Sequence, residues 1–381
     1  MSRTLILGGG FGGLTVSTEL KRILGAQHEV VLVDRKEHFS MGLRKLWELV
    51  GHATIADGSR SRDVLRDRGI RLVRGEIQEI DPLARAANVD GETIDADHLV
   101  IALGAVSRPD LVPGLAENGH DVWDIAGVAA ATEALAQFDG GRIVVLIAGA
   151  PYPCPPAPYE CAMHIHEHLR ERSLRDRSEI TVSTVQPMLM PNAGREGSDW
   201  MGEQLTERGI EYRVASKIER VEPGRVVFAE NDLVFDLLVT VPPHRAPEVV
   251  KTGGLTGEGE WVTVDPATLA TSYPNVFGIG DVTQILLANG LPLPKAGVMA
   301  ELEGARVAAA IAADLQGGTM PPPFDGTGAC FIEMGPASAA LVHGNWYATP
   351  EPQVSIAEPD AKHAAEKRAF ESERLERWFG A

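Results

Sequence analysis

The chain has 381 residues, of which 44% are hydrophobic and 23% charged, and its formal net charge is −18. This length allows two or three domains with a sizeable core, and the composition is that of an ordinary globular protein. The acidic charge argues against nucleic-acid binding and against electrostatic attraction to anionic lipid. No run of 18 apolar residues occurs, and no basic or apolar leader precedes the first predicted strand. We therefore expect a cytoplasmic protein.

A glycine-rich turn follows the first predicted strand, residues 4–7. Gly8, Gly10 and Gly13 stand in G-x-G-x-x-G register, and a helical pattern begins directly after them. In this register the first glycine makes the turn, the second lets the backbone approach a pyrophosphate, and the third lets helix pack on strand. The helix N-terminus then presents free N–H groups to the phosphates.

A second apolar strand, residues 30–33, ends in Asp34. A carboxylate at the end of the second strand, about 20 residues beyond the glycine turn, meets the ribose hydroxyls of a bound dinucleotide. The alternative is a glycine-rich turn without a ligand, but strand, helix and acid together favour a dinucleotide site.

The next segments complete a first α/β unit. We predict an irregular stretch at 38–51, a helix at 63–68, a strand at 71–73, short strands within 77–94 and an apolar strand that closes on Gly104. Residues 1–107 are therefore interpreted as the first half of a dinucleotide-binding domain.

A second α/β unit, residues 108–258, has a strand at 143–148 but not the turn that a second dinucleotide needs. The turn at 151–158 is rich in proline, which fixes φ and removes N–H donors. The next strand, 179–185, ends without a ribose-binding acid. We interpret this unit as a nicotinamide site that no longer binds nicotinamide.

From residue 259 to 316 the first domain resumes. A strand near 276–278 leads to Gly280 and Asp281, and Lys295 and Gly297 precede a helix at 299–315. A helix N-terminus here would stabilise negative charge on a bound ligand. The C-terminal region, 317–381, begins with a Pro- and Gly-rich linker and ends in a charged helix near 362–378.

Three cysteines are present, too few for a disulfide scaffold in a cytoplasmic protein of this size. Cys154 lies in the proline-rich turn at the start of a predicted helix, 159–171, where a helix N-terminus lowers the pKa of a thiol. Cys161 falls within that helix, and we expect it to be a buried apolar residue. The sequence leaves Cys330 open between these two roles.

Other residues are open to a functional or a structural interpretation. His164, His166 and His168 suggest a metal cluster, but only the first and third share a helical face, so solvated helix residues are expected and no metal site is predicted. Trp47 is either a residue of the ligand site or a core aromatic residue, and His244 either faces the cleft or belongs to a turn.

Taken together, these motifs resemble the sulfide dehydrogenase branch of the FAD-dependent disulfide oxidoreductases, which contains sulfide:quinone oxidoreductases and the flavin subunit of flavocytochrome c sulfide dehydrogenase. The specific signature is Cys-Pro-Pro-Ala-Pro-Tyr-Glu at 154–160. The resemblance implies an α/β fold with two Rossmann-like domains and bound FAD. The cofactor-binding residues that it implies are Gly8, Gly10, Phe11, Gly12, Gly13, Asp34, Arg35, Ile77, Gly104, Gly280, Asp281, Lys295 and Gly297.

The resemblance also implies that Cys154 and Cys330 form a redox pair beside the flavin. Hydrosulfide would attack their disulfide, one sulfur would become a persulfide, and the freed thiolate would pass two electrons to the flavin. Glu160 would tune the pocket as a third catalytic residue, and Lys295 and Phe331 would tune or wall it.

The chain departs from the quinone-reducing members in two respects. Those members carry a third active cysteine, and residues 105–141 contain none. They also have a longer C-terminus with helices that dip into the bilayer. Here the last helix is highly charged, so we expect it to pack on the domain or on a second subunit. At most, Trp378 and Phe379 would make peripheral contact with a membrane. A homodimer is left open.

The sequence thus predicts an enzyme that oxidises sulfide or a related small sulfur species and passes the electrons through FAD to a quinone. One alternative is an NAD(P)H-dependent reductase or NADH:quinone enzyme of the same fold. Another is a binding protein with a structural FAD.

Overall fold

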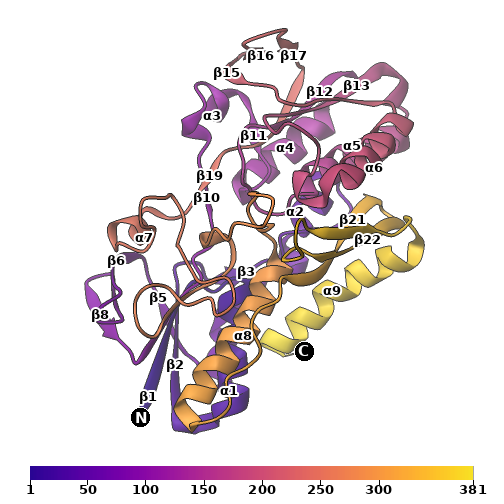
Figure 1. Cartoon of the computed structure of the whole chain (residues 1–381). Coiled ribbons are helices and arrows are strands. Elements are labelled where there is room, and N and C mark those ends of the chain that lie inside the picture. Colours follow the sequence, from indigo (N-terminus) through magenta and orange to yellow (C-terminus); the bar gives the residue numbers. More distant parts are fainter. Residues whose placement is uncertain (381) are drawn as a thin grey trace.

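The computed structural model describes residues 1–380, and two parallel sheets dominate it, one in the lower half of Figure 1 and one in the upper half. The lower sheet has the order β20-β9-β1-β2-β5 and the upper sheet the order β11-β18-β12-β13-β14. Parallel strands that helices cover on both faces are buried, and their sequences are therefore runs of apolar residues. Strands β1 and β12 have such runs. The strand bounds are Ser2–Leu7 (β1), His28–Asp34 (β2), Arg71–Arg74 (β5), His98–Ile101 (β9), Val276–Gly278 (β20), His120–Asp121 (β11), Gly141–Ile147 (β12), Ser178–Thr184 (β13), Ile210–Arg213 (β14) and Leu237–Val241 (β18).

Each half also carries a small antiparallel sheet of three strands, and a third such sheet follows near the C-terminus. The first two are meanders that extend from the parallel sheets. The third, β21-β22-β23, joins the two halves because its residues pack into the cores of both. The strands are Ile77–Asp81 (β6), Ala86–Val89 (β7), Glu92–Asp95 (β8), Ile218–Glu222 (β15), Arg225–Phe228 (β16), Leu233–Val234 (β17), Thr327–Gly335 (β21), Ser338–Asn345 (β22) and Gln353–Ile356 (β23); two short ladders pair His38–Phe39 (β3) with Arg60–Ser61 (β4) and Val106–Ser107 (β10) with His244–Arg245 (β19).

The helices pack against these sheets and against one another. They are Phe11–Leu24 (α1), Arg44–Leu49 (α2), Leu115–Asn118 (α3), Ile125–Gln137 (α4), Ala157–Glu171 (α5), Gly194–Glu207 (α6), Glu248–Thr252 (α7), Gly297–Gln316 (α8) and Ala361–Phe379 (α9). Helices α1 and α8 lie side by side (Figure 1). A Cβ added at Gly304 would come within 2.8 Å of the carbonyl oxygen of Gly12, so the two backbones touch where these glycines meet.

The predicted α/β fold is confirmed, and most of the predicted elements are present. Two local predictions are wrong. The stretch 38–51 contains helix α2, whose buried Leu46, Trp47 and Leu49 give it an apolar face. The helix predicted at 63–68 is a short 3₁₀ turn, Arg62–Arg66. The division of the chain at residues 107, 258 and 316 remains a prediction.

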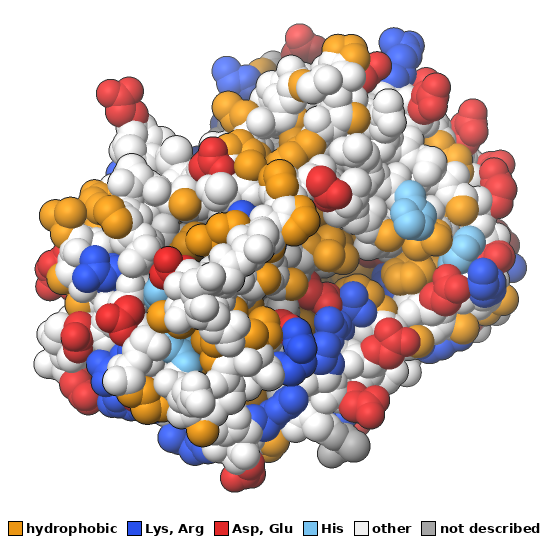
Figure 2. Space-filling view, turned by 60° about the horizontal axis from the view of Figure 1, so that its bottom comes forward, with side chains coloured by type: hydrophobic (Ala, Val, Ile, Leu, Met, Phe, Trp, Pro, Cys, Tyr) orange, Lys and Arg blue, Asp and Glu red, His pale blue; other side chains and the backbone are white. Residues whose placement is uncertain are grey.

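Within residues 1–380 every helix is too short or too polar to span a bilayer. In the face shown by Figure 2, hydrophobic side chains are interspersed with charged ones rather than gathered in one broad surface. Trp378 and Phe379, the aromatic residues at the end of α9, are buried. The C-terminal helix therefore packs on the protein, as the sequence favoured.

Candidate active site and cofactor cradle

The glycine turn has the geometry expected of a dinucleotide loop. Gly8 adopts a φ of +104°, and a Cβ there would lie 2.3 Å from the carbonyl oxygen of Ala102. A Cβ at Gly13 would lie 1.8 Å from the carbonyl oxygen of Gly8, whereas a Cβ at Gly10 would meet nothing within 4 Å. The outer two glycines thus pack strand on helix, and the middle one leaves open space at the N-terminus of α1 for a ligand.

Asp34 ends β2 beside this turn. Its carboxylate accepts hydrogen bonds from the amides of Gly9 and Lys36, both at 2.7 Å. The guanidinium of buried Arg62 lies 3.6 Å from the same carboxylate and donates to the carbonyl oxygen of Gly9. Arg62 was not predicted from the sequence, and it fixes the acid and the turn together.

The other predicted residues of this half lie on its margin. Arg35 is exposed and forms an ion pair with Glu76 at 3.3 Å. Ile77 begins β6 and packs partly buried against the lower core. Gly104 has a φ of +68° and open space around its Cα, which leaves its role as a contact for a ligand a prediction.

The second half of the cradle is built from the turn Gly280–Val282 and the segment before α8. One side-chain oxygen of Asp281, Oδ1, is buried without a hydrogen-bond partner, and burial raises the pKa of this carboxyl group. Glu303 accepts a hydrogen bond from the amide of Gly280 at 2.5 Å, and burial raises its pKa to about 7. An orphan acceptor in a turn beside a helix N-terminus is a position that a hydroxyl-bearing ligand would satisfy.

Lys295 holds this turn in place. Its Nζ donates to the carbonyl oxygens of Asp281 and Thr283, both at 2.7 Å, and lies 3.5 Å from the ring centroid of Trp261. Burial lowers the pKa of Lys295 to about 8. The carbonyl oxygen of Lys295 accepts a hydrogen bond from the amide of Cys154 at 2.6 Å, so one residue joins the turn to the cysteine loop.

Cys154 and Cys330, which lie far apart in the sequence, line the same apolar cavity of about 80 Å³. Pro155, Ala296 and Phe331 are among its other walls. Cys154 has a φ of +58°, a region that residues other than glycine rarely adopt. All three cysteines are unpaired in the structure, and Cys161 is buried in the upper core. Its predicted structural environment is therefore confirmed.

One prediction about Cys154 is wrong. Its side chain is exposed at the mouth of the cavity, yet the protein atoms packed around the sulfur desolvate the thiol and raise its pKa. The carboxylate of Glu160 raises it further. The same two causes raise the pKa of Cys330 to about 12. The N-terminus of α5 therefore does not give Cys154 the lowered pKa that its sequence position suggested.

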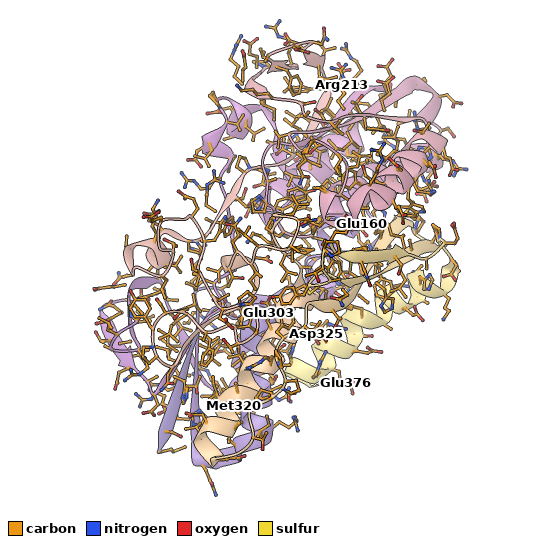
Figure 3. All side chains as sticks on the ribbon, in the orientation of Figure 1. Glu160, Arg213, Glu303, Met320, Asp325 and Glu376 are labelled. Atoms are coloured by element: carbon orange, nitrogen blue, oxygen red, sulfur yellow. The ribbon has the colours of Figure 1, made fainter. Side chains whose placement is uncertain are left out.

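Glu160 belongs to a buried ionic cluster behind the cavity. Its Oε1 accepts from Nζ of Lys367 and from the amide of Glu333, both at 2.6 Å. The ammonium of Lys367 also lies 2.9 Å from the carboxylate of Glu333, which accepts in addition from Nε1 of Trp47. Helix α5, the β21 strand and α9 thus meet at one cation, and Figure 3 shows Glu160 beside the β21–β22 hairpin.

The prediction that the histidines of helix α5 are solvated is wrong for His164 and His166. His164 is fully buried with Nε2 at 3.4 Å from Glu333, and His166 is also buried. Within residues 1–380 no three histidine, cysteine or acidic side chains are grouped in a way that could hold a metal ion. His244 is buried in the β10–β19 ladder, with Nδ1 at 2.8 Å from the carbonyl oxygen of Pro242, so it is part of the framework.

The chain matches the pyridine nucleotide-disulphide oxidoreductase family over residues 2–312. It belongs to this family. Over 300 residues it is 27% identical to the mitochondrial sulfide:quinone oxidoreductase of Mus musculus, a match that covers 74% of this chain and 65% of the mouse protein. It is also 23% identical over 346 residues to a type II NADH:quinone oxidoreductase of Staphylococcus aureus, with 83% of each chain covered. The predicted resemblance is confirmed.

Among solved structures, the sulfide:quinone oxidoreductase of Aquifex aeolicus superimposes with a TM-score of 0.89. The superposition covers all of this chain and 92% of the other, at 22% identity. At this identity the likeness shows the fold, including the C-terminal part that follows the family match.

The family is one of FAD-binding oxidoreductases, and the cradle described above fits this cofactor. The helix N-terminus with its open Gly10 suits the pyrophosphate, Asp34 the adenosine ribose, and the orphan oxygen of Asp281 a hydroxyl of the ribityl chain. Glu303, Arg62, Glu333 and Lys367 were missed from the sequence. A signal existed for Glu303, which is an acid on the otherwise apolar face of a predicted helix.

Proposed function

We propose that the protein oxidises sulfide, or a related small sulfur species, through Cys154 and Cys330 and passes the electrons through FAD to a quinone. The observation that carries this proposal is the shared cavity, because it brings together two cysteines that are 176 residues apart in the sequence. The cavity also reaches Ala296 and Val298, which flank Gly297 at the N-terminus of α8. The sulfur site and the predicted flavin site are thus neighbours.

The chemistry would begin with a disulfide between Cys154 and Cys330 in the oxidised enzyme. Hydrosulfide attacks the sulfur of Cys154, the S–S bond breaks, Cys154 carries a persulfide, and Cys330 leaves as a thiolate. The disulfide is the oxidant in this exchange, and FAD, when bound, would supply the two-electron acceptor that returns the reduced cysteines to the disulfide. The walls of the cavity around the persulfide are apolar, and Lys367 favours the thiolate because its charge lowers the pKa of both thiols.

An open groove of about 1400 Å³ adjoins the cavity and shares Phe331, Val298 and Val354 with it. Its lining is partly polar, but Val298, Leu302, Phe331, Val354 and Phe370 give it an apolar part that suits a planar ring system. This groove supports a quinone as acceptor, as do the names of the related enzymes.

The test is an anaerobic titration of the purified flavoprotein with sulfide, followed by a soluble quinone analogue. We expect sulfide to bleach the flavin absorbance and the quinone to restore it. Cys154→Ser and Cys330→Ser should each slow bleaching by about 100-fold or more, since removing a member of a catalytic unit disables it. Cys161→Ser is the matched control and should bleach at the rate of the wild type. Equal bleaching rates in all three variants would refute the cysteine mechanism.

The second candidate is an NADH:quinone oxidoreductase, which the Staphylococcus relative favours. The turn after β12 argues against it, because Pro151, Pro153, Pro155 and Pro156 remove amide donors where a second pyrophosphate would bind. NADH added under the same anaerobic conditions decides between the two candidate functions. If NADH bleaches the flavin absorbance faster than sulfide does, the protein is an NADH:quinone oxidoreductase.

A further inference from the structure

The C-terminal helix α9 reaches both helix N-termini of the FAD cradle. Trp378, in its last turn, has no exposed surface, and its ring meets Phe11 edge-on at 5.1 Å and Phe39 at 5.5 Å between centroids. Phe11 is the first residue of α1 and lies within the glycine turn. A Cβ at Gly297, the first residue of α8, would come within 2.9 Å of the same Phe11 ring.

Helix α9 also neutralises a buried acid in α8. Glu301, one turn after Gly297, is 6% exposed. Its carboxylate pairs with Arg374 at 2.7 Å and with Arg377 at 2.5 Å. An unpaired carboxylate here would cancel part of the positive potential at the N-terminus of α8, the end of the helix that we expect to face the cofactor. Arg374 and Arg377 neutralise the carboxylate and so preserve this positive potential.

Further contacts fix the position of α9 along its length. Glu371 forms a two-pronged ion pair with Arg44, at 2.6 and 2.7 Å. The carbonyl oxygen of Arg377 accepts from Arg68 at 2.6 Å. Figure 1 shows the yellow helix running from the β21–β22 hairpin to the cradle helices. The middle and the last turn of α9 are therefore both attached to the part of the protein that carries the cradle.

We propose that α9 is a clasp for FAD, in which Trp378, Arg374 and Arg377 are positioning residues that hold the N-terminal turns of α1 and α8 in the geometry and potential that bind the cofactor. This proposal rests on FAD as cofactor and is independent of the sulfur chemistry. Its consequences are slower FAD dissociation and a more positive flavin potential than the cradle would have without the helix, because a positive potential favours the reduced, electron-rich ring.

The test is FAD affinity, measured by the rise in flavin fluorescence as the holoenzyme is diluted and by rebinding of FAD to the apoprotein. In the double variant Arg374→Gln/Arg377→Gln we expect the dissociation constant to rise about tenfold, since a buried carboxylate loses both partners beside the cofactor. The midpoint potential of the flavin should become more negative. Arg368→Gln, an exposed arginine on the same helix, is the matched control and should match the wild type.

A charge-rescue variant separates electrostatics from a general structural role. Adding Glu301→Gln to the double variant should restore most of the FAD affinity and the potential. Should the arginine pair be required for folding, Trp378→Phe keeps the aromatic contact with a smaller ring and should release FAD several-fold faster. An affinity within twofold of the wild type in both the double variant and Trp378→Phe would overturn the proposal, as would a failure of Glu301→Gln to rescue. Sulfide activity is not needed for any of these measurements, so the clasp and the sulfur chemistry can fail separately.

Discussion

Replacing Lys367 by Met removes the cation that two buried carboxylates share. Lys367, Glu160 and Glu333 are 7%, 3% and 4% exposed, and the ammonium contacts the two acids at 2.6 and 2.9 Å. Breaking a buried ion pair by deleting one partner costs about 3–5 kcal/mol, because the remaining charge is desolvated without compensation. Here two like charges remain, so we expect a loss in the free energy of unfolding at the upper end of that range.

The pH dependence of this loss has a defined sign. Burial alone would raise the pKa of Glu333, but ion pairing with Lys367 outweighs it and holds this pKa well below its usual range, so the stabilisation is present above the unfolded pKa and is lost as the pH falls. Burial would lower the pKa of Lys367, but the two acids raise it, so its contribution is present below its unfolded value and is lost in strong alkali. In Lys367→Met, Glu333 loses the cation that holds its pKa down and protonates more readily. The difference in the free energy of unfolding between variant and wild type should therefore narrow on acidification.

Urea unfolding of the FAD-loaded protein at about pH 7.5 and at about pH 4.5, close to the pKa of a glutamate in the unfolded chain, measures both effects. Lys362→Met is the control, since its side chain is 75% exposed and pairs only with Glu366 one turn away, an interaction worth about 0.5 kcal/mol or less. A loss below about 1 kcal/mol for Lys367→Met, or a gap that widens in acid, would refute the assignment of a buried, charged cluster.

Gly13→Ala should destabilise the protein by about 3 kcal/mol or more and weaken FAD retention, because its Cβ would lie 1.8 Å from the carbonyl oxygen of Gly8; thermal unfolding with and without added FAD measures this. Glu160→Gln should lower the pKa of Cys154 and so speed alkylation of the reduced thiol by iodoacetamide at neutral pH, by about tenfold for each unit of pKa, as mass mapping of the labelled peptide would show. Burial lowers the pKa of His28 to about 4, so stability should fall as the pH drops from 6.5 towards 4, by about 1.4 kcal/mol per pH unit, and His28→Gln should flatten this part of the profile in urea titrations.

The sequence predicted those parts of the site whose chemistry depends on local backbone. The glycine turn and the acid at the end of β2 follow from one strand, one turn, one helix and the strand after it, and the structure has all of them. The helix at 299–315 follows from its apolar period and is present as α8. In both cases the residues that determine the local structure lie close together in the sequence.

What could not be predicted depends on contacts between distant segments. The raised pKa of Cys154 arises from apolar walls supplied partly by β21 and from Glu160, which no local pattern reveals. In the sequence, Lys367 is one of many charged residues in the last helix, which we expected to pack on the domain or on a second subunit without knowing which charges would be buried. Its helical spacing with Ala364, Glu371 and Leu375, at intervals of three and four residues, nevertheless places it on the buried face of α9. That period was the one available signal.

The thiol environment has a consequence for the direction of the proposed sulfur chemistry. Apolar walls and Glu160 disfavour the thiolate at both Cys154 and Cys330, so the reduced pair is a weak nucleophile at neutral pH. A disulfide between them would also have a poor leaving group, since a thiol of high pKa leaves slowly. The positive charge of Lys367 lowers the pKa of both thiols and so favours the thiolate at each sulfur. Because Lys367 is carried by α9, the helix that we propose to clasp FAD also supplies the charge on which the departure of the leaving thiolate depends.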